Sequence, residues 1–182
     1  MKKISGAELL AQYASGKRDF SEVDISEADL FEANLQGIDL TGSKLQKTYL
    51  PYSNLSQAEL QQAQLQSAQL SDAQLYQANL SEANLRQANL FRATLRRANL
   101  RGAILENANL QGADLGNADL SGANLSNADL SGANLDRANL SQAQLSGSNL
   151  FRTQNVDFSN AYLDSSTIYP NGHRTDNLQT GE

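Results

Sequence analysis

The chain has 182 residues, a formal net charge of −6 and no cysteine, so neither a disulfide framework nor a thiolate site is available. No apolar run approaches the length needed to span a membrane, and Met1-Lys2-Lys3 leads into a polar segment rather than a secretory signal. The length fits one domain of roughly 150 residues. We therefore expect a single cytoplasmic domain with no membrane segment.

Residues 1–18 predict a short helix that caps the start of the repetitive region after it. Ser5-Gly6-Ala7-Glu8 has the form of a capping box, and Gly16 can end the helix. The apolar face of this helix is expected to contain Leu9, Leu10, Tyr13 and Ala14. Docking of a partner by this segment is the alternative interpretation, but repetitive folds need caps at their ends.

Between Phe20 and Leu150 every fifth residue is large and apolar, and from Ala58 to Ala143 an alanine precedes each of these residues by two positions. On a helix this spacing would scatter the leucines around the axis, because successive ones would differ by about 140°. On a flat strand successive leucines would point to opposite faces, because five is odd. The chain must therefore bend once per repeat, which predicts a solenoid with leucine and alanine inside.

The units A-N-L-S-E, A-N-L-R-Q, A-D-L-S-G and A-N-L-D-R match the A-(D/N)-L-x-x consensus. In them the chain resembles pentapeptide repeat proteins. Its opening Glu8-Leu9-Leu10, Tyr13 and Gly16-Lys17-Arg18-Asp19-Phe20-Ser21 resembles the N-terminal cap of cyanobacterial members. The resemblance implies an all-β fold, a right-handed quadrilateral parallel β-helix with 20 residues per coil. Charge pairing at that spacing favours four sides over three, though only slightly. The opposite-charge pairs are Asp24/Lys44, Glu27/Lys47, Asp72/Arg92 and Arg86/Glu106.

Two places break the pattern. Pro51 lies between Tyr49 and Tyr52, and because proline has no N–H it is expected to interrupt the pairing of neighbouring coils. The register slips at 151–157, after which Phe158, Leu163 and Ile168 are the expected repeat centres. The sequence therefore predicts a cap helix at 1–18, a β-helix at 19–169 and a flexible tail at 170–182.

Nothing in the sequence predicts an enzyme, a cofactor site or a metal site. The only histidine, His173, lies in the expected tail, and a nucleophile needs a base held beside it. The periodic glycines do not form a phosphate-binding loop, and the repeat lacks the paired aspartates of calcium-binding nonapeptides.

Function is therefore expected on the outward positions and at the ends. Four aromatic residues share one side if a coil has 20 residues, although isolated surface rings are the simpler interpretation. They are Phe31, Tyr52, Phe91 and Phe151. Arg86, Arg92, Arg96, Arg97 and Arg101 would circle the rod as a belt, which cannot follow one phosphate backbone; nucleic-acid binding is not expected, and an acidic partner is the alternative.

A second aromatic group, formed by Phe151, Phe158, Tyr162 and Tyr169, lies near the C-terminal end. It is expected to cap the last coil. The alternative is that these aromatic residues form the interface of an end-to-end homodimer. The favoured function is a non-enzymatic scaffold that binds an unidentified protein. The alternative, implied by the family resemblance, is a DNA mimic that binds DNA gyrase. A rod of ~34 Å would need on the order of 20 negative charges to match duplex DNA, far more than this chain carries.

Overall fold

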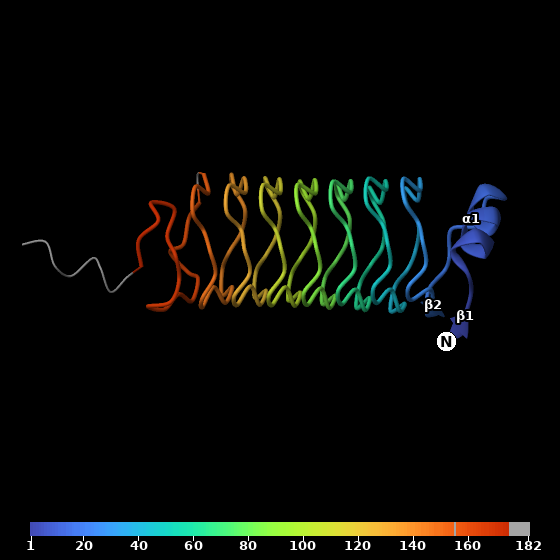
Figure 1. Ribbon diagram of the computed structural model, residues 1–182, viewed down its shortest axis with the longest axis horizontal. Helices are drawn as coiled ribbons and strands as arrows, with labels where there is room; N and C mark the ends of the chain where they lie inside the picture. The colour runs from blue at the N-terminus through green and yellow to red at the C-terminus, as the bar shows by residue number, and fades with distance from the viewer. Residues whose placement is uncertain (155, 175–182) are drawn as a thin grey trace, which may run out of the picture.

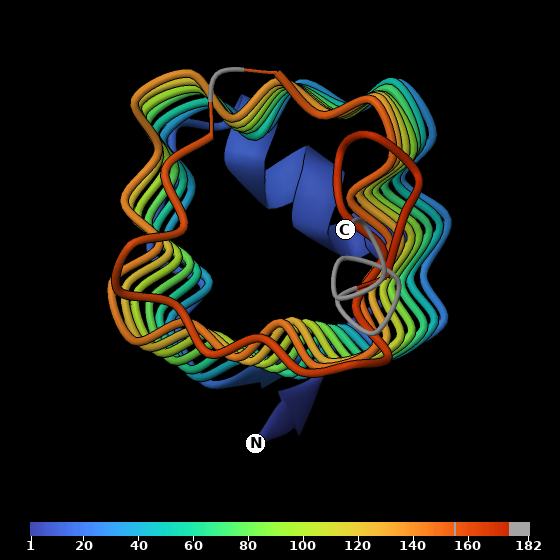
Figure 2. The ribbon, with the colours of Figure 1, turned by 90° about the vertical axis from the view of Figure 1, so that its left-hand side faces the viewer.

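The structure is a computed structural model that describes residues 1–154 and 156–174. The chain winds into a rod of stacked coils that is square in cross-section (Figures 1 and 2). Its regular elements are two short strands, β1 (Lys2–Lys3) and β2 (Val23–Asp24), and one helix, α1 (Gly6–Ala14). The rest of the rod consists of turns and single bridges. No helix in the described part is long and apolar enough to cross a membrane.

Neighbouring coils pair in parallel at a spacing of 20 residues, from Asp19 with Asp39 to Asn134 with Gln154. The backbone N–H of Leu50, for example, donates to the carbonyl of Gln69 at 2.8 Å. The predicted quadrilateral β-helix is therefore confirmed. Its four faces are named by the repeat centres they stack: face A (20, 40 and so on to 140), face B (25 to 145), face C (30 to 150) and face D (35 to 135).

The interior is filled by the leucine and alanine columns. From Leu30 to Leu150 the repeat centres are at most 3% exposed. Where a hydroxyl replaces the inward alanine, it bonds to a backbone carbonyl of the tube wall: Ser43 Oγ donates to Phe20 O at 2.9 Å and Ser53 Oγ to Leu50 O at 2.7 Å. A buried hydroxyl with a partner costs little, so these residues fit the core as alanine does.

The corners explain why asparagine and aspartate precede so many leucines. The second residue after each regular centre has positive φ, as at Glu22 (54°) and Arg152 (61°). The carboxylate or amide oxygen before the leucine accepts the N–H of the residue after it, as Asp119 Oδ1 does from Ser121 at 3.0 Å. This Asx turn satisfies an N–H that the coil ladder leaves unused.

The same geometry overturns the expectation for Pro51. Proline stands at the position of the repeat whose N–H makes no bond to another backbone group, so its missing N–H removes no hydrogen bond between coils. The bonds on either side persist: Glu32 N–H donates to Pro51 O at 3.0 Å, and Tyr52 N–H donates to Ser71 O at 3.1 Å. The residue before the leucine here is Tyr49, which has no oxygen close enough to the backbone to form an Asx turn.

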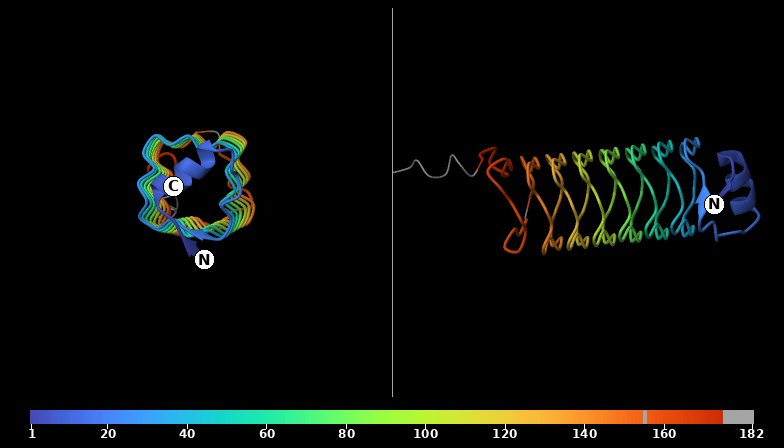
Figure 3. Two further views of the ribbon diagram at one scale, coloured as in Figure 1. Left: turned by 90° about the vertical axis from the view of Figure 1, so that its right-hand side faces the viewer. Right: turned by 90° about the horizontal axis from the view of Figure 1, so that it is seen from below.

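Helix α1 covers the first coil, as predicted, and lies across the square opening (Figure 3). Ser5 caps it by accepting the Glu8 N–H at 3.1 Å, and Leu9 is fully buried. The expected apolar face was partly wrong, since Leu10 and Ala14 are exposed. Strand β1 covers part of the first coil as well, by pairing with β2 in parallel.

The C-terminal register differs from the prediction. Gln144 pairs with Tyr162 and Asn149 with Ile168, so Leu163 takes a centre position but Ile168 does not. Thr167 is buried in place of an alanine, and its hydroxyl donates to Leu145 O at 2.9 Å. The bond from the Thr167 hydroxyl therefore holds Thr167, rather than Ser166, in the inward position of the last coil.

The start of the expected flexible tail also folds back onto the rod. Tyr169 N–H donates to His173 O at 2.8 Å, and Ile168 forms an antiparallel bridge with Arg174. The remainder of the expected tail, 175–182, lies outside the described residues, as does residue 155 within the predicted slip.

Candidate interaction surfaces

The net charge of the rod is concentrated on one face. Over the repeats from 19 to 152, face A carries six acidic side chains and one arginine, whereas charges on faces B and D nearly cancel. Face C carries four acids and two arginines. The six acids of face A are Asp19, Glu22, Asp39, Glu59, Glu82 and Asp119.

The arginine belt is largely neutralised by its neighbours. Arg86 Nη2 lies 2.6 Å from Glu106 Oε2, and Arg92 Nε lies 3.1 Å from Asp72 Oδ1, each one coil away as predicted. Of the other three arginines, Arg96 and Arg97 lie on face D and Arg101 lies on face A. Arg96 approaches Asp114 at 3.7 Å, and Arg97 Nη1 donates to Tyr76 Oη at 3.2 Å. Few of these cations remain available to an acidic partner.

Three exposed aromatic rings cluster on face C near the N-terminal end. The Phe31 ring stacks on Tyr49 with centroids 6.0 Å apart and meets Tyr52 edge-on at 5.9 Å. The three side chains are 47%, 46% and 55% exposed, and Pro51 is buried between the two tyrosines. The interpretation of Phe31 and Tyr52 as isolated rings was therefore wrong. Tyr49 was missed, although a 20-residue coil places it beside Asp29, two residues before Phe31.

Phe91 and Phe151 lie on the same face but far from this cluster: Phe91 is three coils from Phe31, and Phe151 is three coils further along. The guanidinium of the arginine that follows each phenylalanine in sequence lies over its ring. The guanidinium carbon of Arg92 is 5.9 Å from the Phe91 ring centre, and that of Arg152 is 4.9 Å from Phe151. Such cation–π contacts are worth ~0.5–1 kcal/mol at an exposed site.

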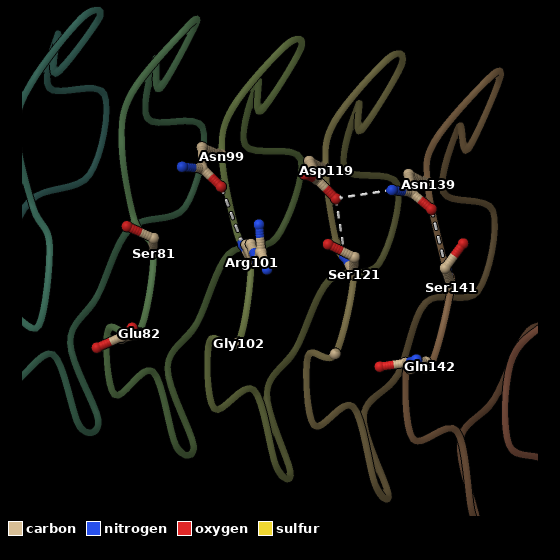
Figure 4. Close-up of a pocket in the computed structure, with 11 residues that line it drawn as sticks. Ser81, Glu82, Asn99, Arg101, Gly102, Asp119, Ser121, Asn139, Ser141 and Gln142 are labelled. Atoms are coloured by element: carbon tan, nitrogen blue, oxygen red, sulfur yellow. Dashed lines mark hydrogen bonds between the residues drawn. The ribbon is translucent and has the colours of Figure 1, made fainter.

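A groove of about 750 Å³ runs along face A over four coils (Figure 4). It is open because Gly102 and Gly122 occupy corner positions there, and its walls are polar. The serines in it hold Asx-turn bonds, Ser121 N–H with Asp119 and Ser141 N–H with Asn139 at 3.1 Å, rather than a base. The arrangement provides no activated nucleophile.

At the C-terminal end, Phe158 packs against the core and meets Tyr169 edge-on at 6.1 Å. Tyr162 is 62% exposed. The carboxylates here accept hydrogen bonds in turns, as Asp164 does from the Ser166 N–H. The Ser166 hydroxyl and other donors around Asp164 lower the pKa of that carboxyl to about 2. Across residues 1–154 and 156–174, no group of three or more histidine, cysteine or acidic side chains is placed to hold a metal ion.

The family model for pentapeptide repeats matches eight copies, over residues 19–46, 38–75, 68–107 and 113–150. The chain belongs to the pentapeptide repeat family. Among solved structures, this pentapeptide repeat protein is similar to HetL, a pentapeptide repeat protein involved in heterocyst differentiation regulation in the cyanobacterium Nostoc sp. strain PCC 7120. The identity is 29% over 94% of this chain and 99% of HetL, with a TM-score of 0.51.

A second pentapeptide repeat protein from Nostoc, alr5209, is 32% identical over 90% of this chain and 98% of its own, with a TM-score of 0.36. QnrB1, a plasmid-mediated fluoroquinolone resistance protein, is 18% identical over 90% of this chain and 89% of its own, with a TM-score of 0.48. A search among curated proteins returned no match. The family match and the likeness to HetL agree with the right-handed quadrilateral β-helix described above.

Proposed function

We propose that this pentapeptide repeat protein is a non-enzymatic scaffold that binds another protein through face C. The observation that carries the proposal is the exposed cluster of Phe31, Tyr49 and Tyr52 on a rigid, flat surface. Aromatic residues are enriched at protein interfaces, and a group of exposed rings marks a docking site more often than single rings do. HetL, which has a regulatory role, supports an interaction function.

A rigid surface also favours binding, because little conformational entropy is lost when the partner docks. The backbone of the cluster is held on both sides by the ladder, through Leu30 N–H to Tyr49 O at 2.7 Å and Leu50 N–H to Gln69 O at 2.8 Å. The rings therefore start from an ordered platform.

Quantitative affinity capture from the source cell tests this function. Wild-type protein is compared with the variant Phe31→Ala/Tyr49→Ala/Tyr52→Ser and with the control variant Tyr76→Ala, which lies on face D. We expect at least one protein to be captured by wild type and by the control but lost with the triple variant. Equal capture by all three proteins would remove face C as the docking surface.

A homodimer through the C-terminal end is a second proposal about partners, and it rests on Tyr162, which is 62% exposed beside the packed Phe158 and Tyr169. Sedimentation velocity of the full chain and of the Tyr162→Ser variant distinguishes a dimer from a monomer. A dimer that dissociates in the variant supports the proposal. A monomer in both samples rejects it.

A further inference from the structure

We infer that the face C cluster recognises an arginine-bearing segment of the partner, with the guanidinium lying against Tyr52 and paired with Glu32. The inference rests on the proposed scaffold function and names the chemistry of the partner that this surface fits.

The first argument is a column of equivalent corner positions on face C. Glu32, Tyr52, Asp72 and Arg92 follow one another along it, one coil or ~4.8 Å apart. At one end of this column, Arg92 Nε is 3.1 Å from Asp72 Oδ1. Glu32 stands on the opposite side of Tyr52, and no ion pair to it occurs within residues 1–154 and 156–174. A guanidinium supplied from outside would repeat the pairing that Arg92 makes with Asp72.

The second argument comes from the dipeptides that carry the rings of face C. Phe91 and Phe151 are each followed by an arginine that lies over the ring. Phe31 is followed by Glu32, so the same corner presents a carboxylate beside the ring instead of a cation. The cluster thus has both groups that attract a guanidinium, an aromatic surface and a negative charge.

No cation of this chain fills that role in the described part of the structure. The cations that lie over rings near the N-terminal end are Lys17, 4.6 Å from the Phe20 ring centre, and Arg18, 3.9 Å from that of Tyr13. Lys47, the nearest cation to Tyr49 in sequence, lies 4.0 Å from Glu27. None of them lies over Phe31, Tyr49 or Tyr52.

The surroundings favour a cation over an anion. Residues 19–39, the first coil and the start of the second, carry seven acidic side chains and no basic one. The resulting negative potential speeds the encounter with a basic segment. Arginine suits the site better than lysine, because its planar group stacks on a ring and pairs with a carboxylate at the same time.

The test uses the full chain and the peptide Ac-RGRGR-NH2, with a peptide in which citrulline replaces each arginine as the uncharged control. Calorimetry measures affinity, and ring NMR signals of Phe- and Tyr-labelled protein report the site. We expect the arginine peptide to bind and to shift the signals of Tyr49 and Tyr52, and the citrulline peptide to bind about tenfold more weakly or not at all.

Glu32→Arg is the decisive variant, because it reproduces the dipeptide found at 91–92 and so preserves the local fold while occupying the site from within. We expect it to weaken binding at least about tenfold, and Tyr52→Ala to weaken it about threefold or more. Glu22→Arg is the matched control, because it changes the net charge by the same two units. It reverses a charge in the same coil at the same corner position of face A, where there is no ring cluster, and is expected to leave affinity within about twofold.

Four outcomes would overturn the inference. Equal binding of the citrulline peptide would show that the positive charge does not contribute to binding, and equal weakening by Glu22→Arg and Glu32→Arg would show general electrostatic attraction without a site. If the wild-type chain self-associates and Glu32→Arg abolishes this association, the surface binds a second copy of this chain instead. If capture of a partner depends on face C but the arginine peptide does not bind, the scaffold function stands and the recognition of arginine falls.

Discussion

Gly6 lies directly against the backbone of Asp29: a Cβ added at residue 6 would be 2.8 Å from the Asp29 carbonyl oxygen. Real Cβ atoms do not approach a backbone oxygen this closely, and the Asp29 segment is held by its own ladder bonds on both sides. The first turn of α1 can therefore sit on the first coil only because residue 6 has no side chain.

Gly6→Ala is accordingly expected to destabilise the protein by about 1–3 kcal/mol, despite the higher helix propensity of alanine. Chemical denaturation measures the loss, and hydrogen exchange localises it to α1 and the first coil. Gly116→Ala serves as the control, because its added Cβ would meet side-chain atoms rather than backbone, the nearest being Asp114 Oδ1 at 3.2 Å. A Gly6→Ala protein as stable as wild type would contradict the close packing of the cap.

Leu95→Ala removes a fully buried side chain from the middle of the tube. The coil backbones are fixed by hydrogen bonds and cannot collapse into the cavity, so we expect a loss of about 3 kcal/mol or more. The exposed Arg101→Ala provides the comparison and should change the free energy of unfolding by less than about 0.5 kcal/mol. Similar denaturation midpoints for the two variants would speak against a close-packed interior.

The pKa of Asp164 is lowered from 3.8 to about 2, first by the Ser166 hydroxyl, 2.5 Å from Oδ1, and then by backbone N–H groups. Because the folded pKa is depressed, this stabilisation is complete above about pH 4 and is lost as the pH falls toward 2. Ser166→Ala should raise the pKa of Asp164 toward its ordinary value, as measured by NMR titration of the carboxyl carbon. Ser159→Ala, which acts on Asp157, should leave Asp164 unchanged, and a shift of Asp164 in that control would refute the assignment.

Purified protein at micromolar concentration is expected not to inhibit supercoiling by DNA gyrase, with a quinolone as the positive control. The physical reason is charge. Even face A carries only six acidic side chains, and Arg101 lies on the same face, whereas duplex DNA of the same length carries on the order of 20 negative charges. Inhibition at this concentration would support the DNA-mimic alternative and would contradict the proposal that the protein acts through face C.

The interior could be predicted because it depends on local chemistry repeated many times. A leucine every five residues with an alanine two positions before it permits few folds other than a tube, and the Asn or Asp before most of these leucines fits the turn that closes a corner. The error at Pro51 arose because the sequence does not say which N–H groups the ladder uses. Likewise, Thr167 took an inward position through a bond to Leu145 O that no spacing rule foretold.

The candidate site was predicted less completely. Phe31 and Tyr52 could be assigned to one side from the period, but their contact with Tyr49 depends on which way three side chains turn at a shared corner. Leu10 was placed on the buried face because helical periodicity cannot reveal how wide the covered surface is.

The sequence by itself determined the repeating tube, its sealed core and the absence of cysteine chemistry, because these follow from periodicity and composition. Only the tertiary structure decided which other groups meet across coils: the ring cluster, the approach of Arg96 to Asp114 and the contact of Gly6 with Asp29. Those relationships join residues 18 or more positions apart, and their energies depend on side-chain directions that are set by the stacking of one coil on the next.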